Sequence, residues 1–294
     1  MSRESGLISV IICSAGRLEP LIATLESLEQ VATPHGRQAE LLLIDNNASP
    51  TYQNVLDENS LPWEKRYVHE PTRGLSNARN RGLAESKGEV IVFTDDDMRF
   101  EPDFLVALAR PLLDGTADAA AGAIKIAPDL EEPWMEPWHR IAFASTEHLD
   151  MDDPKGFVGA NFGFHTRVLE DVPGFDVELG AGKLGTGEET VFASQMIEAG
   201  YRIVGVPESI VWHHFDPSRK SRESLMKASE AWGKSNAWID FKYNGVWVKQ
   251  LGLRLLKAET QLRAHRMTVK RGASPMDVRE STLVKNIAST AARR

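Results

Sequence analysis

The sequence predicts an α/β protein, with a mostly parallel sheet flanked by helices and a helical C-terminal extension. Three observations support this fold class. Apolar runs of strand length alternate with helical patterns over the first 127 residues, an order typical of βαβ units with right-handed crossovers. One buried strand pattern, residues 89–94, runs directly into three aspartates. After residue 217 the chain becomes basic, and its apolar residues recur at helical spacing.

The first half is expected to alternate strands and helices. Leu21, Leu25 and Leu28 share one face of a helix over residues 18–30. A turn cluster that begins at Asp45 stops the second strand, and Gly88 is expected to end a helix over residues 75–87. The patterns predict strands at residues 7–13, 40–44, 65–69, 89–94 and 119–126, and a further helix at 103–113.

The second half is less regular. Residues 128–155 are rich in proline and acidic residues and are expected to form a long irregular segment or short helices. Strand patterns follow at 157–165, 202–206 and 210–212, with a helix at 189–199 that Gly200 ends and another at 222–242. A basic amphipathic helix is predicted from the spacing of Trp247, Leu251, Leu255, Ala258 and Leu262. We expect it to pack back on its own domain, and the last twenty or so residues to be frayed.

Composition and charge narrow the classes of protein. Cys13 is the single cysteine, so an internal disulfide is excluded and nothing indicates an oxidising compartment. The apolar run at residues 7–13 is too short for a signal peptide or a membrane span, which predicts a cytoplasmic protein. Residues 1–216 carry 17 Lys and Arg against 36 Asp and Glu, whereas residues 217–294 carry 17 against 6. The acidic part should repel nucleic acid, while the basic end suits an anionic membrane surface, an acidic partner or the acidic body of its own fold.

Three adjacent carboxylates, Asp95, Asp96 and Asp97, carry the strongest chemical signal. Ligands of open α/β sheets bind outside the carboxyl ends of the strands. Mg²⁺ and Mn²⁺ take oxygen ligands from one or two carboxylates and complete their shell with substrate phosphates. The motif therefore predicts a divalent metal held against a phosphorylated ligand, and a solvated acidic turn is the alternative.

The glycine-rich phosphate fingerprints are missing. No G-x-G-x-x-G and no Walker lysine motif follows the first strand, which argues against a dinucleotide dehydrogenase and a P-loop NTPase. The first loop carries Ser14 and Arg17 instead, and the second strand ends in Asp45. A carboxylate there can accept hydrogen bonds from a nucleobase or a ribose, although Asp-Asn-Asn also favours an Asx-turn.

Six segments in order resemble family 2 glycosyltransferases of the GT-A fold. They are VIICSAGR at residues 10–17, LIDNNAS at 43–49, RGLSNARNRG at 73–82, FTDDD at 93–97, and, in the second half, GEET at 187–190 with VWHH at 211–214. The resemblance implies a GT-A domain over residues 1–216, with a nucleotide-binding half at about 1–127 and an acceptor half at about 128–216. Residues 217–294 then form a basic helical C-terminal extension.

The resemblance also implies roles on the donor side. Asp45 would hold the base of a nucleoside-diphosphate sugar, and Arg79 would approach the base and ribose. Asp95 and Asp97 would be the two ends of the Asp-x-Asp motif around Asp96, with Asp97 the direct metal ligand and Asp95 facing the ribose or the metal. His213 would lie near the pyrophosphate and the metal, as a third candidate ligand for Mn²⁺ or Mg²⁺.

The expected reaction is a single displacement with inversion. Glu189 stands where the family often has an aspartate base and would deprotonate an acceptor hydroxyl, with Glu188 as the other candidate. The metal would neutralise the charge on the leaving diphosphate, and Arg17 or Arg73 would add to that effect. Acids that open a helix are also favoured by its dipole alone, and His213 could be an ordinary strand histidine.

Several other residues have a functional and a structural interpretation. Asn161 lies where the family presents backbone to the donor sugar, or in a core strand. Residues 180–187 contain four glycines and form either a mobile loop that closes over substrate or a plain connector. Trp134 and Trp138 either stack on an acceptor sugar or pack in the irregular segment.

Two other functions stay open from the sequence. A nucleotidyltransferase would need a glycine-rich triphosphate loop, of which residues 14–17 are a poor version. A non-catalytic sugar-nucleotide-binding module predicts loss of the base or metal carboxylates, and both are present. Within the family UDP-sugars are the commonest donors, with guanine and thymine as other bases. The acceptor is left open, and the basic helices favour a peripheral contact with the inner face of a membrane, or a homodimer.

Overall fold

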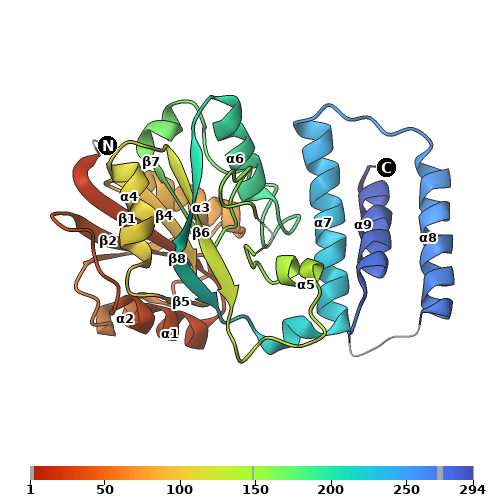
Figure 1. Cartoon of the computed structure of the whole chain (residues 1–294), viewed down its shortest axis with the longest axis horizontal. Coiled ribbons are helices and arrows are strands. Elements are labelled where there is room, and N and C mark those ends of the chain that lie inside the picture. Colours follow the sequence, from red (N-terminus) through yellow and green to blue (C-terminus); the bar gives the residue numbers. More distant parts are fainter. Residues whose placement is uncertain (1–2, 148, 270–273, 294) are drawn as a thin grey trace.

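The computed structural model describes residues 3–147, 149–269 and 274–293. Its centre is one eight-stranded sheet in the order β3-β2-β1-β4-β7-β6-β8-β5, seen in Figure 1 at the opposite end of the molecule from the C-terminal helices. The strands are β1 (Glu4–Ser14), β2 (Gln38–Asp45), β3 (Glu64–His69), β4 (Gly88–Asp95), β5 (Met98–Phe100), β6 (Ala119–Ile126), β7 (Asn161–His165) and β8 (Ile203–His213).

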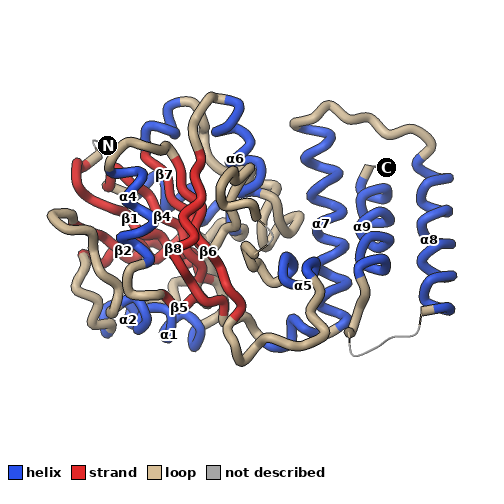
Figure 2. The backbone as a smooth tube through the Cα atoms, in the orientation of Figure 1, coloured by secondary structure: helices blue, strands red, loops and turns tan. Residues whose placement is uncertain are grey.

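Helices cover both faces of the sheet and form a separate stack beyond it (Figure 2). They are α1 (Leu18–Leu28), α2 (Gln53–Glu58), α3 (Leu75–Glu85), α4 (Phe104–Leu113), α5 (Pro137–Ala142), α6 (Glu188–Glu198), α7 (Arg222–Lys242), α8 (Leu251–Thr268) and α9 (Val278–Ala292). Two short 3-10 helices are Thr166–Glu170 and Pro217–Lys220.

The predicted parallel sheet is confirmed for the first half. β1 pairs in parallel with β2 and β4, and β2 with β3. The second half is mixed, because β7 runs antiparallel to β4 and β6, while β8 is parallel to β6 and antiparallel to β5. The fold class is therefore the predicted one, with the antiparallel strands as an addition that alternation of strands and helices does not reveal.

Several predicted element limits were wrong. Gly88 does not end a helix but opens β4, and α3 already ends at Glu85. The two strands expected at 202–206 and 210–212 are one strand, β8, which passes a register shift opposite Gly122 and Ala123. The strand predicted at 157–165 is confined to β7.

Two apolar layers hold the helices to the sheet. On one face, Ile8, Val10 and Ile12 of β1 pack with residues of α1, α2 and α4. On the other face, Ile11 of β1 and Phe93 of β4 pack with residues of α3 and α6. The alternation of Ile8, Ile11 and Ile12 between layers explains why β1 is apolar throughout, as expected for a strand buried on both faces.

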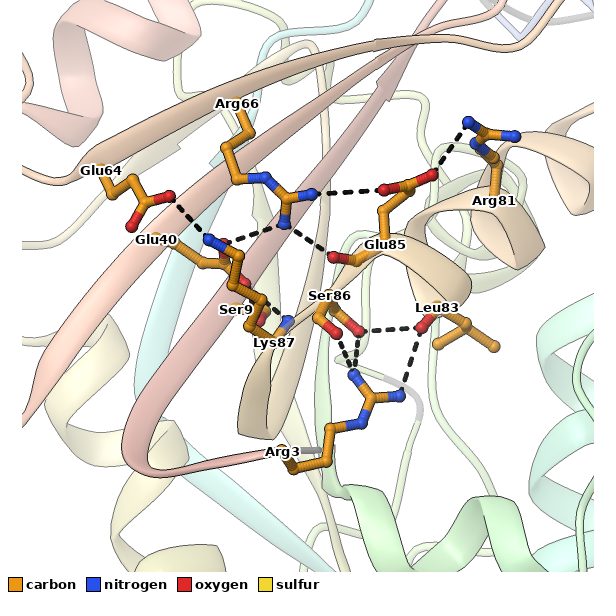
Figure 3. A network of polar contacts seen from close by, with 10 residues as sticks. All are labelled: Arg3, Ser9, Glu40, Glu64, Arg66, Arg81, Leu83, Glu85, Ser86 and Lys87. Carbon is orange, nitrogen blue, oxygen red and sulfur yellow. Dashed lines mark hydrogen bonds and ion pairs between the residues drawn. The ribbon is translucent and has the colours of Figure 1, made fainter. Parts of the chain in front are cut away.

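A buried polar network joins three adjacent strands, β1, β2 and β3, to the end of α3 (Figure 3). Glu40 of β2 is fully buried. Its carboxylate accepts hydrogen bonds from Ser9 Oγ (2.6 Å) and the Lys87 backbone N–H (2.8 Å), and forms an ion pair with Arg66 (3.3 Å). Arg66 also pairs with Glu85 at the end of α3. A buried charge with these partners links β1, β2, β3 and α3, and so fixes the strands whose opposite ends carry the site.

The C-terminal helices form a stack in which α9 lies between α7 and α8 and packs against both (Figure 1). The last residues were expected to be frayed, and this was wrong: Leu283, Val284 and Ala288 of α9 are buried. A third apolar cluster joins this stack to the irregular segment and α5. It includes Trp138, Phe143, Phe215, Leu225, Leu262, Met276 and Leu283.

Candidate active site

A cavity of about 850 Å³ opens at the carboxyl ends of β1 and β4, within the size range of small-molecule sites. Strand pairing places Ser14 beside Asp45 and Cys13 beside Asp95, so the polar residues that follow these strands converge. The wall also includes the start of α3, the glycine-rich loop, the start of α6, and α7. Of the predicted site residues, it contains Ser14, Arg17, Arg73, Arg79, Asp95, Asp96, Asp97, Glu188, Glu189 and His213.

Arg17 bridges two of the three aspartates. Its guanidinium donates to Asp97 Oδ2 at 2.6 Å and pairs with Asp96. Ser14 Oγ donates to the other Asp96 oxygen at 2.6 Å. Burial raises the pKa of Asp96 to about 6, against the lowering effect of Arg17. Asp96 and Asp97 are buried and Asp95 is half-buried, so the triplet is not the solvated acidic turn of the alternative interpretation.

Asp97 and His213 face each other across paired strands. β5 and β8 align Met98 with His213, and His213 Nε2 lies 3.3 Å from Asp97 Oδ2. His213 Nδ1 is 2.7 Å from the Phe143 carbonyl oxygen, which only accepts, so Nδ1 carries a hydrogen. Burial raises the pKa of Asp97, but the His213 hydrogen bond and the charges of His213 and Arg17 outweigh it and hold this pKa well below its ordinary value.

These two residues fit a divalent ion as a two-ligand site. Asp97 Oδ1 is buried and has no hydrogen-bond partner among the described residues. His213 Nε2 lies 3.3 Å from the other oxygen of Asp97, and a bound ion would replace the hydrogen that Nε2 donates there. In the described part of the chain, no three His, Cys, Asp or Glu side chains are grouped to hold a metal by themselves. Two protein ligands are nevertheless usual for Mg²⁺, which takes its other oxygens from phosphates and water.

Arg79 lies in the cavity wall but is almost fully buried. Its guanidinium donates to Glu188 Oε1 at 2.8 Å and to the Gly159 carbonyl oxygen at 3.2 Å, and lies 3.7 Å from Asp95. Three aromatic rings surround it at 5.5 to 5.8 Å, namely Phe93, Phe162 and Phe175. Arg79 therefore joins the aspartates at the end of β4 to the acids at the start of α6.

The adjacent acids of α6 differ in their surroundings. Gly187, with a φ of 94°, precedes the helix and turns both carboxylates toward the cavity. Glu188 is buried and paired with Arg79. Glu189 forms no such ion pair within the described residues, and Oε2 of both acids is buried without a hydrogen-bond partner there. Burial and the neighbouring charge of Glu188 raise the pKa of Glu189 well above its ordinary value, although Arg79 lowers it in part.

Asp45 and Asn161 are not among the residues that line the cavity. Asp45 is fully buried and accepts from the Asn47 and Thr51 backbone N–H groups and from the Tyr67 hydroxyl; the Asx-turn interpretation is thus present in the structure. Asn161 Nδ2 donates to the carbonyl oxygens of Ala123 and Ser209. Its side chain therefore joins β7 to β6 and to β8, the next strand beyond it.

The tryptophans near the site are not the expected pair. Trp134 and Trp138 pack in the third apolar cluster, which agrees with their structural interpretation. Trp232 of α7 lines the cavity instead, together with Ala228 and Ala231. Lys285 of α9 lies over its ring at 3.8 Å. Nothing in the local sequence distinguishes Trp232 from other helical tryptophans, so no sequence signal for it was available.

Arg219 is a second residue that the sequence did not indicate. Its Nη1 lies 3.5 Å from His213 Nε2, and its Nη2 donates to the Ala142 carbonyl oxygen at 3.1 Å. The side chain stacks over Phe215 at 5.5 Å. The sequence signal that could have indicated Arg219 is its position six residues after His213 of the VWHH segment. Arg219 brings a positive charge to the side of the cavity that holds Asp97.

The glycine-rich loop lies between α3 and α7. The Leu75 backbone N–H donates to the Ala181 carbonyl oxygen at 2.9 Å. A Cβ added at Gly185 would lie 2.5 Å from Cβ of Ala231. Close approach to α7 is thus one reason for glycine at position 185. Closure of this loop over substrate stays a prediction.

Comparisons with known proteins identify the family. Residues 9–173 match the model of glycosyl transferase family 2, which is more than half of the chain, so the chain belongs to this family of transferases. Succinoglycan biosynthesis protein ExoM of Rhizobium meliloti (strain 1021) is 29% identical over 231 residues, which cover 76% of this chain and 71% of ExoM. Probable glycosyltransferase YdaM of Bacillus subtilis (strain 168) is 22% identical over 278 residues, 86% of this chain and 61% of YdaM.

Solved glycosyltransferases share the fold. Mannosyltransferase PcManGT from Pyrobaculum calidifontis, solved in complex with GDP-Man and Mn²⁺, superimposes with a TM-score of 0.65 at 17% identity, over 97% of this chain and 86% of that one. TarS 1–349 from S. aureus, solved with UDP-GlcNAc, gives 0.53 at 16% identity, over 90% and 76%. The predicted family and the GT-A fold are confirmed, and the chain is a glycosyltransferase rather than a nucleotidyltransferase.

Proposed function

We propose that this glycosyltransferase moves a sugar from a nucleoside-diphosphate sugar to an acceptor hydroxyl, with a divalent cation and with inversion. One observation supports this most strongly: the same cavity contains a candidate cation site at Asp97 and His213 and a carboxylate with a raised pKa at Glu189. A leaving diphosphate needs positive charge, and an acceptor hydroxyl needs a base. The candidate cation site and the candidate base lie in one cavity of the size of a small-molecule site.

On the donor side, Asp97 and His213 would hold Mn²⁺ or Mg²⁺ through Oδ1 and Nε2. The bound ion would supply Lewis-acid stabilisation to the leaving diphosphate. Arg17, Arg73 and Arg219 line the same cavity and add positive charge for the phosphates. The Mn²⁺ in the mannosyltransferase neighbour supports a metal-dependent reaction.

On the acceptor side, Glu189 would take the proton of the attacking hydroxyl. A raised pKa makes a carboxylate a stronger base near neutral pH. Glu188 is held by Arg79 and would position its neighbour. One displacement from the face opposite the diphosphate inverts the anomeric centre. Ala228, Ala231 and Trp232 of α7 would bound the acceptor, with the indole ring as an apolar platform for a sugar.

The donor base is proposed to be uracil, with guanine and thymine as the alternatives that UDP-, GDP- and dTDP-sugars represent. Asp95 would face the ribose, near Arg79. A contact between Asp45 and the base stays a prediction; it would require one of the five hydrogen bonds at Asp45 to be shared. The division into a catalytic domain over 1–216 and an extension over 217–294 is likewise proposed.

The proposal is tested by thermal stabilisation with UDP, GDP and dTDP, each with Mn²⁺ and with EDTA. We expect one diphosphate to stabilise the protein in the presence of the metal, and slow hydrolysis of the matching sugar nucleotide. Asp97→Asn should lose the metal-dependent stabilisation, because the buried ligand oxygen is replaced. Asp57→Asn, on the exposed side of α2, is the matched control. Stabilisation that is the same in EDTA would exclude the metal site.

A further inference from the structure

The connection between α7 and α8 and the first turns of α8 expose an unusual set of side chains. We call residues 241–257 the basic tip. Its apolar residues Trp247, Leu253 and Leu256 are 80%, 66% and 61% exposed, and Phe241 is exposed as well. No Asp or Glu occurs between residues 241 and 257. Clustered apolar exposure of this kind marks an interaction surface rather than ordinary surface composition.

The rest of the protein does not need these side chains for packing. α8 packs against α9, with Ala258 and Leu262 as its buried residues. Leu253 and Leu256 are on the exposed side of the outermost helix of the stack (Figure 1). The Trp247 ring contacts Phe241 edge-on, with 5.3 Å between the ring centroids, so these two exposed aromatic residues of the basic tip lie together. The predicted amphipathic helix is thus only partly correct, since α8 has apolar residues on two sides and Trp247 precedes it.

The charges of the basic tip favour an anionic partner. Lys249, Arg254 and Lys257 are exposed and form no ion pair within the described residues. A two-fold contact with a second copy would place these cations against the same cations, which is repulsive. A lipid surface presents negative charge over apolar material and has no fixed shape, so it can receive cations and protruding apolar side chains together.

We propose that the basic tip docks this protein on an anionic lipid bilayer. Trp247, Leu253 and Leu256 enter the boundary between headgroups and acyl chains, and the cations meet lipid phosphates. No helix of the described chain is long and apolar enough to cross a bilayer, so the contact is peripheral. Trp232 of the cavity wall is nine residues from Phe241 on α7, roughly 14 Å along the helix. Docking therefore brings the acceptor side of the cavity near the headgroups. This consequence rests on the proposed function, whereas the docking proposal is independent of it.

The test is co-sedimentation of the full chain with vesicles of phosphatidylcholine alone and of equal parts phosphatidylcholine and phosphatidylglycerol. We expect binding to the anionic vesicles that weakens with added salt. Lys249→Ala, Arg254→Ala and Lys257→Ala together should weaken it on the order of a hundredfold, from about one kcal/mol per cation. The combination Trp247→Ser, Leu253→Ser and Leu256→Ser should weaken it by at least about tenfold, because interfacial burial of apolar area is lost.

Matched controls separate docking from other effects. Ile197→Ser on α6, at 43% exposure, and Arg110→Ala on α4 should bind vesicles like the unchanged protein. The triple variants should keep metal-dependent stabilisation by the nucleotide, so a failure of docking is distinguishable from a failure of the proposed function. No binding to anionic vesicles, or binding unaffected by both triple variants, would overturn the proposal. Light scattering could instead show that the unchanged protein is a dimer and the triple serine variant a monomer. That result would assign the basic tip to contact with a second copy and would also overturn the proposal.

Discussion

Glu188 and Glu189 are neighbours in the chain, yet they lie in different surroundings. Glu188 shares a buried ion pair with Arg79, which stabilises its charge. Glu189 is half-buried beside that charge without a cation of its own, which raises its pKa. An acid with a raised pKa favours the folded state when protonated, and this contribution is lost as the pH rises through the raised pKa.

Glu189→Gln should therefore abolish transfer and make the protein more stable at neutral pH. The expected gain in the free energy of unfolding is about 1.4 kcal/mol for each pH unit between the ordinary glutamate pKa and the working pH, up to the raised pKa. The gain should vanish at about pH 4, below the ordinary pKa of a glutamate. Glu188→Gln is the matched control; it should cost about 3 kcal/mol, because Arg79 stays buried without its partner. Urea unfolding at neutral pH and at about pH 4 measures the free energy of unfolding of each variant. A Glu189→Gln variant that transfers sugar normally would assign the base elsewhere.

The pH profile of transfer gives an independent check. Only ionised Glu189 can accept a proton, so kcat/KM should rise with pH through the raised pKa of this carboxyl group. Donor binding should not follow the same curve, because the pKa of Asp97 is held low and this carboxylate stays ionised. Transfer rates and thermal stabilisation by the nucleotide, both measured over the same pH range, separate the effect on catalysis from the effect on donor binding. A rate that is flat from the ordinary glutamate pKa upward would contradict the assignment.

For single residues, the sequence predicted the candidate site best where those residues directly follow strands. Asp95, Asp97 and Ser14 were predicted as site residues at or after the carboxyl ends of strands, where ligands of open α/β sheets bind, and the structure brings them to one cavity. Arg219 and Trp232 were missed, because they reach the cavity from parts of the chain whose packing depends on tertiary contacts. Asn161 was placed on the correct strand, but its side chain faces the strands rather than the ligand space.

Among the elements, α7 and α9 depend on a close approach of their backbones. A Cβ added at Gly233 of α7 would lie 2.3 Å from the Lys285 carbonyl oxygen and 2.8 Å from Cβ of Ala288. The helices cannot keep this spacing with a larger residue. Glycine inside a helix is otherwise unfavourable by roughly 1 kcal/mol, so tight packing is the physical reason for this one.

Gly233→Ala should lower the free energy of unfolding by about 1–3 kcal/mol, because overpacking outweighs the better helix propensity of alanine. Asn236→Ala, at an exposed position of the same helix, is the control and should be neutral or slightly stabilising, because alanine is the better helix former. Thermal and urea unfolding measure both variants. A Gly233→Ala variant as stable as the unchanged protein would show that the two helices can separate without cost.

Element types were predicted better than element ends. β4 and α3 were expected from their periodicity, but Gly88 was assigned to a helix end because glycine is common there. α9 was missed since its sequence is polar; it is ordered by packing between two other helices, and local propensity alone does not show that. The pairing of β7 and β8 was not predictable, because connections through irregular segments do not fix strand direction.

For the whole molecule, the third apolar cluster crosses the proposed domain boundary. Phe143 and Phe215 belong to the first 216 residues, whereas Leu225, Leu262 and Leu283 come from the C-terminal helices. Part of the cavity wall also comes from α7. The extension is therefore a component of the site and of the core, more than an appendage to a finished domain.

A chain that ends at residue 216 should expose these aromatic residues. We expect it to bind a hydrophobic dye and to unfold without a sharp transition, while a chain that lacks residue 294 alone should behave like the full protein. Circular dichroism melts and dye fluorescence test this. A shortened chain that melts cooperatively near the temperature of the full protein would support the first 216 residues as an independent folding unit.

The position of α9 has a consequence for biosynthesis. It follows both α7 and α8 in the chain, and yet it fills the space between them. Because folding during synthesis proceeds from the N-terminus, the sheet can form first, whereas α7 gains its main packing partner only once residues 278–292 have left the ribosome. A nascent chain can thus present the strand ends of the cavity before the wall that α7 supplies is held in place.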